Sequence, residues 1–488
     1  MTDQAGAKGE QPTARDGLSF RKRTRVVSAP SPALDRIELF ERGFMIFSVA
    51  VFLGLSNLWR KTAELDPSSV GASQHNPLNT GLYLLVLVVG ILLVLVRKRE
   101  VLPVLAVSKM FWIFMAWAVA SAIWSIDPDL TLRRLALFFA PVIVALYAAA
   151  RFDPTTTIRL AGWAYFWTIV ASAIVAVLFP QIGVMHDSAM AVKWADLAEG
   201  ARLEGDWSGT LGHKNVLGFA TLASTQVFAW RWYVEKEKRW LHAAIILFGM
   251  FVAYKTHSAT TALLILITLG TYSLFHLTRQ ARRLRALIFF AVVVVAVVSV
   301  GLAISLPEQF TALVGKDATL TGRVPIWIVL LRDVIPQNPI FGTGFNTFFI
   351  IENPSYRRLV EIVGWPAPHA HNGYLNLATE LGIPGALLGT FILLRLLVGS
   401  MLRVNDENAP WVVHVLVFAL TFAILNIVES SLLRISDNWA FALPFCCFAL
   451  WKYQAEARPK AQPAPRRWGN VAPGTPLGKR LGKHTELS

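Results

Sequence analysis

The chain has 488 residues, of which 55% are hydrophobic and only 16% are charged, and its net charge is +15. Ordinary soluble domains carry roughly a quarter charged residues, so this composition excludes an ordinary soluble domain. The basic residues gather in the tails and in short connections, which argues against a nucleic-acid partner and for a membrane. Cys446 and Cys447 are adjacent within an apolar run, which argues against a disulfide or a cysteine metal site.

Apolar runs long enough to cross a bilayer recur along the chain. A span needs ~17–25 residues to cross a ~30 Å hydrocarbon core, and we predict an all-α polytopic membrane protein with about twelve spans. Residues 37–453 form this domain, and the basic tails 1–36 and 454–488 are predicted to be disordered. The spans are 39–57, 80–96, 104–124, 131–150, 159–179, 215–233, 240–256, 258–275, 286–306, 383–402, 411–428 and 437–453.

The distribution of basic residues predicts the orientation of these spans. Lysine and arginine follow alternate spans, on the same side as both tails, at 97–99, 236–239, 279–285 and beyond 452. Positive connections stay in the cytoplasm, so we expect both termini on the cytoplasmic side of a bacterial inner membrane. The two long connections, 180–214 and 307–382, then lie on the outer, periplasmic face, and loops of this length are usually functional.

The second outer loop contains local helix signals. Pro325 is expected to open a short amphipathic helix over 326–335 that lies on the membrane surface. Its apolar face is predicted to comprise Trp327, Leu330, Leu331 and Val334. Further on, Asn372 is predicted to cap a helix that ends at Gly382.

Three outer-face stretches carry polar residues suited to chemistry. They read RLEGDWSGTLGHKN at 202–215, TGR at 321–323 followed by FGTGF at 341–345, and HAHNGYL at 369–375. With SAIWSIDP at 121–128, their order and spacing resemble the O-antigen ligase and polymerase superfamily, which includes bacterial exopolysaccharide polymerases. The resemblance extends from about residue 39 to residue 450.

The resemblance implies transfer of a saccharide from an undecaprenyl-diphosphate carrier to an acceptor hydroxyl, without metal, nucleotide sugar or other cofactor. The partners it implies are the carrier-linked donor, a saccharide acceptor, the lipid bilayer and other polysaccharide assembly proteins. The matching positions are Arg202, Arg323 and His371. In the family, such arginines are proposed to hold the diphosphate and the histidine to help activate the acceptor.

The chemistry of these residue types agrees with those roles. A guanidinium is a good fixed partner for phosphate oxygens, and a histidine can accept a hydroxyl proton near neutral pH. Each residue also has a simpler reading. Arg202 could be a solvated loop residue, and His371 could only hydrogen-bond near a helix start.

Six neighbouring residues are predicted to bind substrate, namely Lys214, His213, Asn215, His369, Asn372 and Glu380. Lys214 could steer the carrier phosphate, and Asn215 could instead be a helix cap. His369 could share the role of His371. Glu380 could assist as an acid or be structural.

Within this family reading, a polymerase is favoured over an O-antigen ligase that uses lipid A core as acceptor, because the stretch from Trp207 to Asn215 resembles exopolysaccharide polymerases more closely. A transporter or flippase is the alternative from another class. Transporters usually place ionisable groups near the midplane of their spans, and few occur in the predicted spans here.

Overall fold

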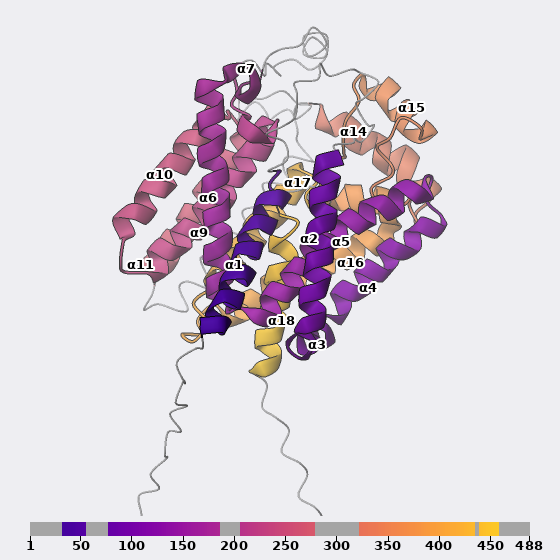
Figure 1. Ribbon diagram of the computed structural model, residues 1–488. Coiled ribbons are helices and arrows are strands. Elements are labelled where there is room, and N and C mark those ends of the chain that lie inside the picture. Colours follow the sequence, from indigo (N-terminus) through magenta and orange to yellow (C-terminus); the bar gives the residue numbers. More distant parts are fainter. Residues whose placement is uncertain (1–31, 55–76, 186–204, 279–321, 435–438, 458–488) are drawn as a thin grey trace, which may run out of the picture. The chain divides into compact units, whose positions relative to one another are not determined.

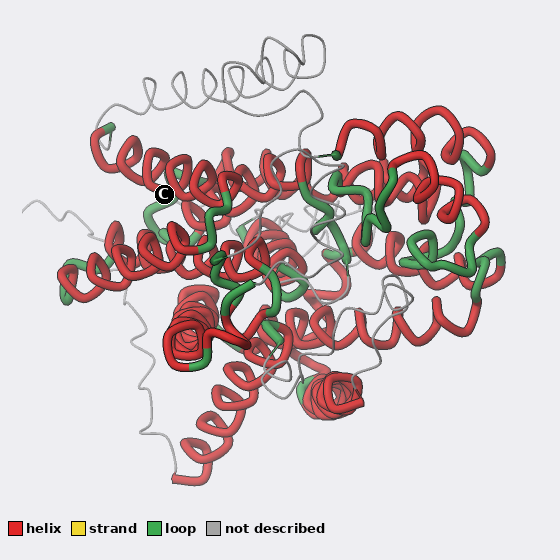
Figure 2. The backbone as a smooth tube through the Cα atoms, turned by 90° about the horizontal axis from the view of Figure 1, so that it is seen from above, coloured by secondary structure: helices red, strands yellow, loops and turns green. Residues whose placement is uncertain are grey.

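The computed structural model describes residues 32–54, 77–185, 205–278, 322–434 and 439–457, and most of these are helical. No strand occurs in these ranges, as Figure 2 shows, apart from an isolated antiparallel bridge between Val184 and Trp207. The chain divides into two units, Met1–Gly43 and Phe44–Ser488, and all the packing described below lies within the second. The predicted all-α class is confirmed.

The helices follow the order of the predicted spans. They are α1 (Pro32–Phe52), α2 (Pro77–Val96), α3 (Lys98–Val107), α4 (Lys109–Ala120), α5 (Pro128–Arg151), α6 (Pro154–Leu178), α7 (Pro180–Gly183), α9 (Lys214–Val234), α10 (Arg239–Lys255), α11 (Ala259–Leu277), α14 (Arg323–Val329), α15 (Pro354–Val363), α16 (Gly373–Arg403), α17 (Val412–Val428) and α18 (Ala442–Glu456).

Among the described residues, five helices are long and apolar enough to cross a membrane: α2, α5, α6, α11 and α16. The pair α3 and α4 is bent by 86° and would make a sixth span if it counts as one. The predicted span 286–306 lies outside the described residues, so the count of about twelve stays a prediction. Two helix ends lie a few residues beyond the predicted bounds, since α1 begins at Pro32 and α18 continues to Glu456.

Local capping signals place several helix ends. Asp127 accepts a hydrogen bond from Leu130 N–H at the start of α5. Asn372 caps α16 by accepting from the N–H groups of Tyr374 and Leu375, and the backbone leaves helical geometry at Gly382, with φ 70° and ψ 178°. The predicted cap and helix break are therefore confirmed.

The helix at 323–337 differs from its prediction. It begins at Arg323, two residues before Pro325, and continues as a short π-helical turn and a 3-10 turn to Gln337. Leu331 is 55% exposed, whereas Ile326 and Val329 are buried. The buried face packs against aromatic and aliphatic residues of the same loop, including Phe348 and Tyr356. It includes Leu330 and Val334 of the predicted face, with Trp327 partly buried against it, so Leu331 is the member of that face that the prediction got wrong.

Side-chain contacts within the second unit define two ends of the helical bundle. At one end, Lys452 of α18 donates to the carbonyls of Ala149 and Ala150 at 3.1 and 3.2 Å, beside the end of α5. At the other end, the starts of α9, α14 and α16 meet the end of α17. Figure 1 shows α7, α14 and α15 at the upper end of this bundle and the end of α18 at the lower. Both long predicted outer loops therefore contribute to the same end.

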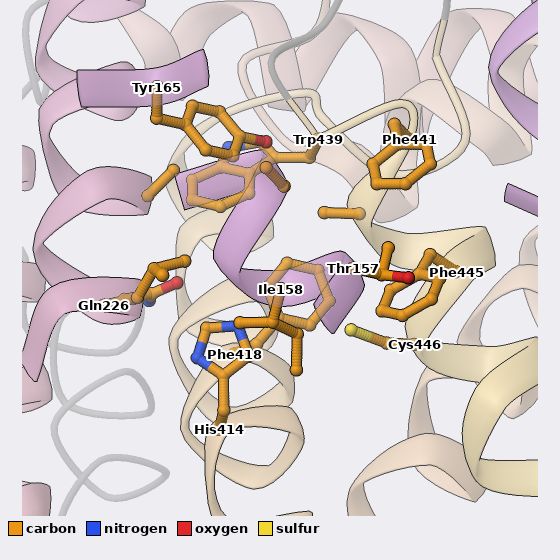
Figure 3. Close-up of a pocket in the computed structure, with 14 residues that line it drawn as sticks. Thr157, Ile158, Tyr165, Gln226, His414, Phe418, Trp439, Phe441, Phe445 and Cys446 are labelled. Carbon is orange, nitrogen blue, oxygen red and sulfur yellow. The ribbon is translucent and has the colours of Figure 1, made fainter. Parts of the chain in front are cut away.

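A small pocket lies inside the bundle between α6, α9, α17 and α18. Figure 3 shows Tyr165, Trp439 and Phe441 around one side and His414 at the other. Most of its lining is apolar, and none of the predicted site residues contributes to it. The candidate site is therefore a different place, at the end of the bundle.

Candidate functional site

Glu429 is the centre of a polar cluster at this end. It follows the last residue of α17, and its side chain is only 7% exposed. Arg323 Nη2 lies 2.9 Å from Oε1 of Glu429, and Asn215 Nδ2 donates to the same oxygen at 3.3 Å. Residues from two distant parts of the chain therefore share one oxygen of this buried carboxylate.

The second carboxylate oxygen faces two histidines. His371 Nδ1 lies 3.4 Å from Oε2 of Glu429, and His369 Nε2 lies 3.8 Å from it. The two imidazole rings have centroids 4.0 Å apart. His371 Nε2 is buried and has no hydrogen-bond partner within the described residues.

The backbone of His371 is unusual and fixes the direction of its side chain. Its φ is +49°, in the left-handed region that few non-glycine residues adopt. Its N–H donates to His369 Nδ1 at 3.1 Å, and the next residue, Asn372, is bound to the end of α17 by donating from N to Ser430 Oγ and from Nδ2 to the Ile427 carbonyl, both at 3.1 Å. Strained backbone held in this way is a frequent feature of functional sites.

Burial and neighbouring positive groups shift the pKa of Glu429 in opposite directions. Burial by itself would raise the pKa of Glu429, but His371, Arg323 and His213 together lower it below the usual value for a glutamate. Burial, together with His371 and two arginines, lowers the pKa of His369 well below its usual value. Near neutral pH the cluster therefore contains an ionised Glu429 and a neutral His369.

The donor atoms of His369, His371 and Glu429 all lie within 4.8 Å of one another, close enough to hold a metal ion. The hydrogen bonds argue against this use. His369 Nδ1 accepts from the backbone, so in the neutral ring Nε2 carries the proton and has no lone pair for a metal. A metal-ligating histidine normally donates its other N–H instead, and Arg323 already provides the positive charge beside this carboxylate.

The first outer loop reaches the cluster through the start of α9. His213 is the N-cap of α9, since Nδ1 accepts from Asn215 N–H at 3.2 Å, and this corrects the alternative in which Asn215 is the cap. Glu429, His371 and Asp206 all act electrostatically on the His213 ring. Lys214 pairs instead with Asp206, at 2.6 Å. Arg202 lies outside the described residues.

Glu380 has a different environment from the cluster. It is buried near the end of the first half of α16, and Oε2 accepts from Asn346 N–H at 3.0 Å. Asn376 also hydrogen-bonds to its side chain. These contacts favour the structural alternative, and a role in substrate binding stays a prediction.

Sequence reasoning missed Glu429. The available signal was an acidic residue directly after the apolar run 411–428, on the predicted outer side. An acidic group at the edge of a span is costly without a partner, which makes it a candidate site residue.

Comparison with known proteins agrees with the motifs. Residues 242–390 match the family model described as O-Antigen ligase. The chain is also 28% identical over 333 residues to the exopolysaccharide production protein ExoQ of Rhizobium meliloti (strain 1021), covering 65% of this chain and 70% of that protein. The resemblance inferred from the motifs is confirmed, and the matched range contains Arg323, His369 and His371 but ends before Glu429.

Proposed function

Starting from this similarity to O-antigen ligases, we propose that the protein is an inner-membrane glycosyltransferase that polymerises saccharide units carried on undecaprenyl diphosphate, at the periplasmic face. The observation that carries the proposal is the grouping of Arg323, Glu429 and His371 at one end of the bundle, with His371 Nε2 without a partner among the described residues. This grouping combines a phosphate-binding cation with a proton acceptor.

In the proposed reaction, an acceptor hydroxyl attacks the anomeric carbon of the donor sugar. The bond between that carbon and the diphosphate oxygen breaks, and His371 Nε2 takes the hydroxyl proton. Glu429 faces Nδ1 and favours the ring tautomer in which Nδ1 carries the proton and Nε2 is basic. The 3.4 Å separation is long, but such contacts often shorten only when substrate binds.

Arg323 supports the departing diphosphate. A guanidinium has five N–H donors, and the contact with Glu429 uses Nη2, so other donors can bind phosphate oxygens. Negative charge grows on these oxygens as the bond breaks, and a fixed cation stabilises it. Glu429 is a positioning residue in this scheme, because it orients both Arg323 and His371.

A second candidate is an O-antigen ligase, which the name of the matching family model favours. The same chemistry would then transfer a completed glycan from the carrier to lipid A core. The two candidates differ in acceptor and not in the residues proposed here.

Deletion of the gene distinguishes these functions when carrier-linked and surface polysaccharides are extracted and sized. Single repeat units on the carrier without long chains support the polymerase, and long chains stranded on the carrier support the ligase. Unchanged chain lengths in both pools would reject both candidates and favour a transporter or flippase. Complementation with His371→Ala or Arg323→Ala, at matched membrane levels, should give the same defect as the deletion.

A further inference from the structure

A second acid–histidine pair lies beside the candidate site. His257 Nδ1 is 2.6 Å from Oδ1 of Asp206, and Lys214 Nζ is 2.6 Å from Oδ2. The Asp206 side chain is 5% exposed, whereas that of His257 is 54% exposed. A buried carboxylate therefore holds one edge of an accessible imidazole ring.

This contact determines the hydrogen-bonding role of the exposed ring nitrogen, Nε2. An ionised carboxylate only accepts hydrogen bonds, so His257 Nδ1 must be the donor. In the neutral ring Nε2 is then an acceptor, and it lies on the side of the ring away from Asp206. The pair thus presents a hydrogen-bond acceptor of defined direction.

The backbone holds the pair in place. His257 has φ +48°, in the tight turn between α10 and α11. Trp207 N–H donates to the Lys255 carbonyl at 2.9 Å, and Met185 N–H donates to the Asp206 carbonyl at 2.8 Å. The two loops that contribute Asp206 and His257 are therefore joined directly.

The surroundings suit a sugar. The Tyr254 ring, 69% exposed, stands edge-on to the His257 ring with centroids 5.8 Å apart. A sugar presents hydroxyl donors together with an apolar face that can pack on an aromatic ring. His213 lies within electrostatic reach of both Asp206 and Glu429, so this pair borders the cluster around Glu429.

We propose that His257, held by Asp206, belongs to a saccharide-binding subsite next to the transfer site, in which Nε2 accepts a hydrogen bond from a sugar hydroxyl. The choice of a saccharide as the ligand rests on the proposed function. The pair binds glycan and takes no part in bond cleavage.

The test is a calorimetric titration of the purified full-length protein in lipid nanodiscs. The probe is the lipid-free oligosaccharide repeat unit, released by hydrolysis from the host's own polysaccharide. His257→Asn retains a donor toward Asp206 but removes the outer acceptor, and we expect its Kd to rise about tenfold. Asp206→Asn should weaken binding similarly, because it no longer fixes the tautomer. His276→Asn, the same change at an exposed histidine in the last turn of α11, should bind as wild type.

A kinetic readout separates binding from a structural role. His257→Asn should raise the acceptor KM about tenfold and change kcat little, with an unchanged thermal unfolding midpoint. An unchanged Kd, or a wild-type protein that binds no oligosaccharide, would overturn the inference. His371→Ala should abolish transfer and still bind the oligosaccharide. Normal transfer by that variant would reject the proposed function without affecting the binding result.

Discussion

Two buried glutamates at the same end of the bundle differ in the kind of partner they have. The hydrogen bonds of Glu380 come from the backbone N–H of Asn346 and from Asn376, which are neutral groups, while Arg434 and Arg134 act on it electrostatically. Glu429 faces Arg323, His369 and His371, whose side chains carry or exchange charge. The partners of Glu429 include His371, whose buried Nε2 has no partner among the described residues and therefore needs an explanation, whereas the hydrogen bonds of Glu380 fix a loop.

The environment of Glu380 is built around the break in α16. Gly344 N–H donates to the carbonyl of Glu380 at 2.8 Å, and Thr343 N–H donates to that of Thr379 at 3.2 Å. The loop before α15 is thus attached to the carbonyls that the break at Gly382 leaves without helical partners. This pattern teaches that burial of an acid alone does not identify an active site.

The largest expected effect is at Glu429. Glu429→Gln keeps the size of the side chain but removes the charge that orients Arg323 and His371, and we expect the transfer rate to fall about 1,000-fold. The measurement is the initial rate of saccharide transfer in proteoliposomes with carrier-linked substrate. Glu380→Gln is the matched control and should retain most of the activity. Equal losses in the two variants would break the distinction between the glutamates.

The break in α16 should be the next most sensitive position. Gly382 has φ 70°, and a Cβ there would lie 2.1 Å from the Ile340 carbonyl oxygen. Gly382→Ala should therefore lower the free energy of unfolding by about 3 kcal/mol, measured by thermal unfolding in detergent. Gly270→Ala is the control, because a Cβ at Gly270 meets nothing within 4 Å. Similar stability of both variants would show that the backbone at Ile340 moves away from the added Cβ at little cost in free energy.

Glu380→Ala tests whether Glu380, unlike Glu429, contributes to stability and not to transfer. The substitution leaves the N–H of Asn346 without its side-chain acceptor, and we expect a loss of about 2 kcal/mol in the free energy of unfolding. Below the unfolding temperature the folded protein should still transfer saccharide. A large fall in specific activity without loss of stability would instead support the predicted substrate-binding role of Glu380.

The smallest expected effect concerns pH and His369. Because the pKa of His369 is lowered in the folded protein, the unfolded chain binds a proton below pH ~6.5 that the folded chain does not. This contribution to stability is present above ~6.5 and is lost as pH falls toward the folded-state pKa, by about 1 kcal/mol at pH ~5.5. His369→Asn keeps an acceptor for His371 N–H and should lose less stability between these pH values. Equal losses in wild type and variant would show that His369 is protonated when folded.

Local signals predicted part of this architecture well. Asn372 and Gly382 act within one or two helical turns, so the sequence nearby was sufficient to place a cap and a break. The contact between Arg323 and Glu429 joins residues 106 positions apart, and no local pattern specifies it. The exposure of Leu331 was missed for the same reason, since packing on Phe348 and Tyr356 sets the buried face of that helix.

The position of Glu429 along the chain has a consequence for biosynthesis. The ribosome makes Arg323 and His371 first, and the carboxylate that orients both follows only after α17 has been synthesised. Synthesis proceeds from the N-terminus at ~5–20 residues per second, so the earlier helices are synthesised before Glu429. Under the proposed function, a chain that ends before Glu429 should therefore be inactive, and activity should begin only after α17 has been synthesised.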